Sequence, residues 1–178
     1  MKKKISIIAT FFNEEGSINE FITRINVSFK KFNHIASEII FIDDASNDLS
    51  NALIKKARTK NKKIKLITLK KRYGVHAGIQ TGFDFVSKKN YATVIDCDLQ
   101  DRPELIAQNF TKIKKEQTIH FVRKKREDSF FQRFYTKIAY LFLHFISEGK
   151  IIRDTGHFKI ISPIAVKKIK KNIEAHPY

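Results

Sequence analysis

Short apolar segments alternate with longer amphipathic segments along the chain, and this order constrains the fold more than any other feature. The alternation repeats about every 30 residues, which is typical of strand–helix units that build a mostly parallel α/β sheet with helices on both faces. The apolar periodicity predicts strands over 5–10, 38–42, 64–69, 92–95 and 158–161, and helices over 17–32, 76–87, 103–115 and 164–173. A further helix is expected through Leu53, Ile54 and Ala57, with Ser46 or Asn47 as its N-cap.

Length and composition favour one folded domain over residues 1–178. Apolar residues make up 42% of the chain, which is ordinary for a globular protein and argues against wholesale disorder. The single cysteine, Cys97, allows no internal disulfide and indicates a reducing compartment such as the cytoplasm. No secretory signal is evident, and no segment approaches the roughly 20 apolar residues of a membrane-spanning helix.

The chain is strongly basic, with a formal charge of +17 from 35 basic and 18 acidic residues. Such an excess favours polyanionic partners: nucleic acid, an anionic lipid surface or a phosphorylated substrate. A solvated lysine surface without a partner is an equal alternative. The sequence contains no helix-turn-helix, zinc-finger or RNA-recognition motif, so a basic nucleic-acid-binding domain stays only as the non-enzymatic alternative.

Polar groups follow each of the first four predicted strands. They are 13–15, 43–44, Arg72-Tyr73-Gly74 and 96–101. Because the carboxyl ends of parallel strands meet at one edge of a sheet, these groups are expected to form a ligand site there.

Asp96 and Asp98 stand two residues apart where the fourth strand ends, so both carboxylates can face one ion. With Gln100 and Asp101 nearby, this set of hard oxygen ligands favours Mg²⁺ or Mn²⁺. The alternative is an acidic loop that only caps the following helix, with Asp101 ahead of Pro103.

Asp43 and Asp44 form a second acidic group at the end of the second strand. They have two interpretations: a turn rich in Asp, Asn and Ser that precedes a helix, or carboxylates that accept hydrogen bonds from a nucleotide base or ribose.

Several ordered motifs together resemble the family 2 glycosyltransferases of the GT-A (Rossmann-like) fold, and more closely their dolichyl/polyprenyl-phosphate sugar transferase branch. The resemblance rests on residues 7–15, 38–48, Tyr73-Gly74, 96–106, 123–126 and 154–160, and it spans nearly the whole chain.

The resemblance implies an inverting transfer of a sugar from a UDP- or GDP-sugar to a polyprenyl phosphate, at the inner face of the cell membrane. The implied roles are nucleotide-sugar binding by Phe12, Glu14, Asp43, Asp44 and Asp96; binding of Mg²⁺ or Mn²⁺ by Asp96, Asp98 and Gln100; and catalysis by Asp98, Asp154 and His157. A basic segment is the candidate binding site for the acceptor phosphate, because guanidinium groups bind phosphate in bidentate fashion. Its candidate residues are Arg123, Arg126, Arg133 and Thr136.

Three departures from the family pattern leave alternatives open. Thr10-Phe11 stands where relatives usually have a proline, His157 replaces a frequent second aspartate, and relatives continue beyond Tyr178. An acceptor that is a sugar hydroxyl on a cell-surface glycan would need Asp154 or His157 as a base. A truncated, inactive relative is the other alternative.

Residues 130–146 are apolar on nearly all sides. This pattern predicts a helix that is buried or lies in a membrane interface.

Overall fold

A computed structural model gives the fold of this protein and describes residues 3–32, 35–114, 117–122 and 155–175. The chain divides into two compact units, one formed by 1–119 with 158–178 and the other by 120–157. The first unit contains most of the sheet and its covering helices. The expected single domain over 1–178 stays a prediction.

The elements alternate as the sequence indicates. The strands are β1 (Lys3–Phe11), β2 (Ile35–Asp43), β3 (Ile64–Thr68), β4 (Tyr91–Asp96), β5 (Ile119–Val122) and β6 (Thr155–Ile161). The helices are α1 (Ile18–Lys30), α2 (Ser50–Lys60), α3 (Val75–Asp84), α4 (Glu104–Phe110) and α6 (Pro163–Ala175).

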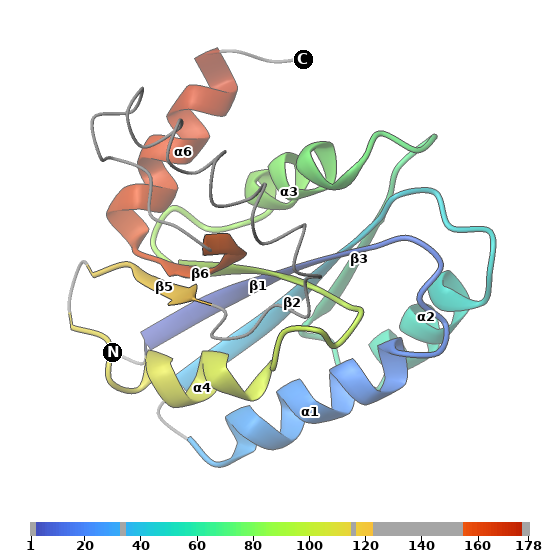
Figure 1. The fold of residues 1–178 in the computed structure, drawn as a ribbon, viewed down its shortest axis with the longest axis horizontal. Coiled ribbons are helices and arrows are strands. Elements are labelled where there is room, and N and C mark those ends of the chain that lie inside the picture. The colour runs from blue at the N-terminus through green and yellow to red at the C-terminus, as the bar shows by residue number, and fades with distance from the viewer. Residues whose placement is uncertain (1–2, 33–34, 115–116, 123–154, 176–178) are drawn as a thin grey trace, which may run out of the picture. The chain divides into compact units, whose positions relative to one another are not determined.

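The strands form one six-stranded sheet in the order β3-β2-β1-β4-β6-β5 (Figure 1). β3, β2, β1 and β4 are parallel, and β6 runs antiparallel to β4. The chain therefore moves outward from β1 to β3 and returns to place β4 on the other side of β1. The predicted mostly parallel α/β fold with helices on both faces is confirmed.

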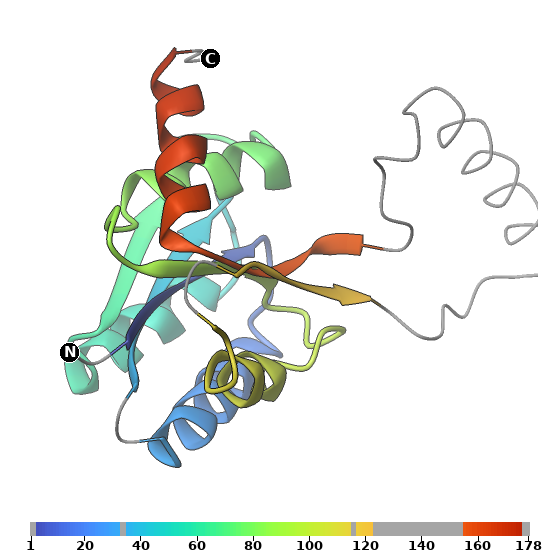
Figure 2. The same cartoon turned by 90° about the vertical axis from the view of Figure 1, so that its left-hand side faces the viewer.

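Helices cover both faces of this sheet (Figures 1 and 2). α3 and α6 pack on one face, over a core that includes Ile8, Ile40, Val94 and Val166. α1 and α4 contact each other on the opposite face, where the ring of Phe41 makes edge contacts with Phe11 and Phe21. Because both faces are covered, the central strands β1 and β4 are buried along most of their length, whereas the edge strand β3 is only partly buried.

Some predicted boundaries were wrong. α2 begins at Ser50, so Leu49 occupies its N-cap position instead of Ser46 or Asn47. Ser46 and Asn47 are hydrogen-bonded to Asn13 in the loop after β1. α4 ends at Phe110 instead of near residue 115. β5 was not assigned from the sequence, since four residues are too few to show a period.

Candidate functional site

The site lies where the strand order reverses, at the carboxyl ends of β1 and β4. Thr10 pairs with Asp96 across these neighbouring strands, and the Thr10 hydroxyl donates a 2.7 Å hydrogen bond to Oδ1 of Asp96. The amide of Cys97 in turn donates to the carbonyl oxygen of Thr10 at 3.3 Å. In open α/β sheets ligands bind at such a reversal point, beyond the carboxyl ends of the strands.

The carboxylate of Asp98 lies in an acidic environment. Burial raises the pKa of Asp98, and the negative charges of Asp96, Glu14 and Asp101 raise it further, while the amide of Gln100 opposes the shift by donating to Oδ1 at 3.0 Å. Leu99, at the centre of the turn, has a φ of 62°, so the chain reverses tightly between Asp98 and Gln100. The cluster favours a positive counter-charge, because each carboxylate raises the energy of its ionised neighbours.

The carboxylate oxygens of Asp96 and Asp98 are suitable ligands for a hard divalent cation. Asp96 uses one oxygen for Thr10, and Asp98 one for Gln100, so each carboxylate keeps an oxygen that can ligate an ion. Within the residues that the structure describes, no three side chains of His, Cys, Asp or Glu are already grouped as a ligand set. Mg²⁺ and similar ions commonly take one or two protein carboxylates and complete their shell with phosphate oxygens and water.

Cys97 lies between the two aspartates in the sequence, but its side chain is fully buried. Burial raises the pKa of its thiol well above the ordinary value, and the charges of Asp96, Glu14 and Asp98 raise it further. The group therefore stays a protonated thiol at neutral pH and is a poor nucleophile.

The carboxylates of Asp43 and Asp44 hold the neighbouring loops. Oxygens of Asp43, which is fully buried, accept hydrogen bonds from the Ser46 amide at 2.8 Å and the Asn51 side chain at 2.8 Å. Oxygens of Asp44 accept bonds from the amides of Tyr73 at 2.7 Å and Gly74 at 2.9 Å. Their predicted contact with a nucleotide stays a prediction.

Arg72 also lies at this edge of the sheet. The sequence predicted its position after the third strand but assigned it no function. Its guanidinium lies over the ring of Phe12, 4.0 Å from the ring centroid. The pair joins the loop after β3 to the loop after β1, at the edge where the predicted nucleotide residues Phe12 and Glu14 lie. A stacked guanidinium is a suitable partner for phosphate or a base.

The structure does not place the remaining predicted residues at this site. Arg123, Arg126, Arg133, Thr136, Asp154 and the segment 130–146 are outside the described residues. His157 is exposed in β6 and belongs to the second unit. The structure brings together Phe12, Glu14, Asp43, Asp44, Asp96, Asp98 and Gln100 at the loops that follow β1, β2 and β4. Asp101 is not the N-cap residue of α4, because Pro103 occupies that position.

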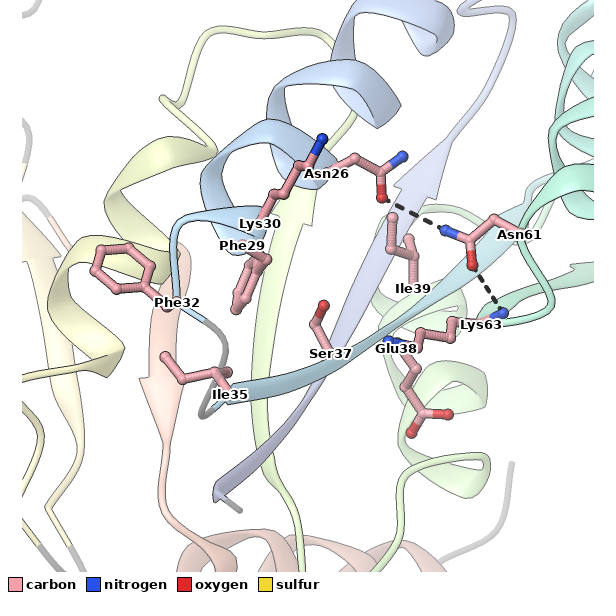
Figure 3. A pocket seen from close by; sticks show the side chains of 10 residues that line it. All are labelled: Asn26, Phe29, Lys30, Phe32, Ile35, Ser37, Glu38, Ile39, Asn61 and Lys63. Carbon is pink, nitrogen blue, oxygen red and sulfur yellow. Dashed lines mark hydrogen bonds between the residues drawn. The ribbon is translucent and has the colours of Figure 1, made fainter.

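A cavity of about 360 Å³ lies at the other end of the sheet, between α1, β2 and the start of β3 (Figure 3). Its lining includes Phe29, Ile35 and Asn61, and none of the predicted site residues. The cavity is therefore separate from the candidate metal and nucleotide site, which lies at the carboxyl ends of the strands.

Known proteins are similar to this chain in sequence and in fold. Residues 6–169 match the sequence model of glycosyl transferase family 2. The undecaprenyl-phosphate 4-deoxy-4-formamido-L-arabinose transferase of Salmonella choleraesuis is 35% identical over 156 residues, which cover 86% of this chain and 47% of that protein. The glycosyltransferase YkcC of Bacillus subtilis is 29% identical over 177 residues, covering 97% of this chain and 54% of its own.

A solved structure with the same fold is glucosyl-3-phosphoglycerate synthase of Mycobacterium tuberculosis in complex with Mn²⁺, UDP and glucosyl-3-phosphoglycerate. It is 16% identical, has a TM-score of 0.59 and covers 91% of this chain and 57% of that one.

This chain spans about half the length of the relatives that it matches in sequence. Among the helices that the structure describes, none is long and apolar enough to cross a bilayer. The ordered strand-end motifs, the mostly parallel sheet and the match over residues 6–169 agree: this chain belongs to glycosyl transferase family 2.

Proposed function

We propose that this chain carries the donor half-site of a metal-dependent inverting glycosyltransferase, which moves a sugar from a UDP- or GDP-sugar to a polyprenyl phosphate. The observation that carries the proposal is the position of Asp96 and Asp98 at the strand-order reversal, where the Thr10 hydroxyl and the Gln100 amide each hold one of their carboxylate oxygens. The undecaprenyl-phosphate transferase named above supports the acceptor class. A membrane-bound acceptor would bring the protein to the inner face of the cell membrane.

Asp96 and Asp98 would hold Mg²⁺ or Mn²⁺, with Gln100 beside them, and the ion would stabilise the nucleoside diphosphate as it leaves the sugar. Thr10 fixes the Asp96 carboxylate by its hydrogen bond, and the Gln100 amide fixes Asp98. Phe12 and Glu14 would bind the nucleotide from the loop after β1.

The acceptor needs little help from a base in this proposal. A phosphate monoester has a second pKa near about 6, so it is largely dianionic at neutral pH and already nucleophilic. Arg123, Arg126, Arg133 and Thr136 are the proposed acceptor-phosphate residues. Inversion follows from direct attack on the face of the sugar opposite the leaving diphosphate.

The test begins with donor binding. A thermal-shift panel of UDP- and GDP-sugars, with and without Mn²⁺, is expected to show stabilisation by one nucleotide class only when Mn²⁺ is present. Asp98→Ala is expected to remove the Mn²⁺-dependent part of the shift. A matched control is Asp84→Ala, because Asp84 is an exposed aspartate at the end of α3, remote from the cluster.

Turnover is then compared with polyprenyl phosphate and with glycan acceptors. Release of nucleotide that requires Mn²⁺ and polyprenyl phosphate, and is lost in Asp98→Ala, supports the proposal. Equal release by Asp98→Ala and the parent protein would show that the metal assignment is wrong. A preference for glycan hydroxyls would instead favour a base-assisted transfer through Asp154 or His157.

A further inference from the structure

We infer that Asn13 is a positioning residue for donor binding: it fastens the loop after β1 to the loop after β2 and thereby holds Phe12 and Glu14 in place. This inference rests on the proposed function. It assigns a role to a residue that is hydrogen-bonded to Ser46 and Asn47 in the neighbouring loop.

Asn13 bridges the two loops through both its backbone and its side chain. Its amide donates to the Ser46 hydroxyl at 3.0 Å, and its side-chain oxygen accepts a hydrogen bond from the Asn47 amide at 3.0 Å. Its φ of 55° is left-handed, a conformation that asparagine adopts more readily than most other residues. The residue type therefore suits both the turn and the bridge.

The following residues continue the same connection. The Glu14 amide donates to the Ser50 hydroxyl at 2.8 Å, and the Glu15 amide donates to Oδ2 of Asp48 at 3.0 Å. In return, the Leu49 amide donates to Oε2 of Glu15 at 2.9 Å. Together with the two bonds of Asn13, these make five hydrogen bonds that join the two loops.

Asn13 stands between two residues of the donor half-site. On one side is Phe12, whose ring contacts the Arg72 guanidinium. On the other is Glu14, whose carboxylate is close enough to Asp98 to affect its ionisation. A shift of the chain at Asn13 moves both side chains together, so the bridge pre-organises the site before the donor binds.

Three variants separate the parts of this bridge. Asn13→Gly keeps access to the left-handed conformation but removes the side-chain acceptor. Ser46→Ala removes the hydroxyl that accepts from the Asn13 amide, whereas Ser46→Thr keeps it. Loss of one such bond in Asn13→Gly or Ser46→Ala is expected to raise the dissociation constant of UDP or GDP with Mn²⁺ about tenfold. Ser46→Thr keeps the bond, so its dissociation constant is expected to stay within about twofold of the parent value.

The matched control is Asn61→Ala, at the cavity of Figure 3. Oδ1 of Asn61 accepts a hydrogen bond from the Lys63 amide at 3.0 Å within a single turn, so the substitution removes the same side-chain acceptor at the opposite edge of the sheet without joining two loops. This variant is expected to lower the melting temperature and leave the dissociation constant of the nucleotide unchanged. A purely structural role for Asn13 would produce the same pattern.

Isothermal titration calorimetry and thermal unfolding on the full chain decide between the outcomes. Parent-like nucleotide affinity in Asn13→Gly and Ser46→Ala, with a lower melting temperature, overturns the inference and leaves the proposed function intact. A parent protein that binds no nucleotide overturns the proposed function, and the inference with it. Weak binding in both variants, restored in Ser46→Thr, is the expected result.

Discussion

Asp44 offers a sharp test of how this site is held together, because the residue is nearly inaccessible at 7% exposure. Its two oxygens accept hydrogen bonds from the amides of Tyr73 at 2.7 Å and Gly74 at 2.9 Å. Gly74 has a φ of 88° and precedes the first residue of α3. The carboxylate thus fixes the turn from which α3 starts, and we expect Asp44→Asn to destabilise the protein even without any nucleotide.

The size of the effect follows from these two bonds. A hydrogen bond to a charged group contributes about 1.5–3 kcal/mol. The carboxamide introduced by Asp44→Asn would keep one acceptor oxygen and turn its NH₂ group towards the other backbone amide, so one bond is lost and two donors face each other. We therefore expect the free energy of unfolding to fall by about 2 kcal/mol, which corresponds to a melting temperature about 4–8 °C lower for a chain of this length.

Urea denaturation measures this change directly, provided that the slope with denaturant stays that of the parent protein. Asp84→Asn is the matched control, since Asp84 is exposed and its substitution is expected to change stability by no more than about 0.5 kcal/mol. If Asp44→Asn were as stable as this control and lost only nucleotide affinity, the carboxylate would serve the ligand and not the turn, and the reasoning above would be refuted.

Two further predictions concern the packing of the helices. Gly82→Ala is expected to cost about 1–2 kcal/mol in urea denaturation, because its Cβ would overlap with Cγ2 of Ile8 on the sheet, and the helix propensity of alanine offsets only part of that. Glu104 lies in a bidentate ion pair with Arg24, whose hydrogen bonds lower the pKa of the glutamate. The ion pair therefore stabilises the protein fully above the pKa of Glu104 in the unfolded chain, and this stabilisation is lost as the pH falls through the lower pKa of the folded state. We expect Glu104→Gln to be about 1 kcal/mol less stable than the parent protein at pH 7, and this difference to vanish in acid. A difference that stayed constant with pH would contradict the assignment.

The sequence by itself determined the type and order of the elements. Apolar periodicity is local, so it located four parallel strands and the helices between them, and the strand-end motifs indicated the family. It also located the acidic pair Asp96 and Asp98, because the end of an apolar segment fixes where a strand ends. The start of α2 and the end of α4 were predicted wrongly, because the apolar periodicity continues past the residues where these helices begin and end.

Only the tertiary structure decided how distant groups meet. The bond from Thr10 to Asp96 joins residues 86 positions apart, and the bonds from the Tyr73 and Gly74 amides to Asp44 cross from one loop to another. No local pattern encodes such pairs, since they follow from strand order and register. For the same reason the sequence suggested Ser46 and Asn47 as caps of the next helix, whereas the sheet brings the loop after β1 beside them and they bind Asn13 instead.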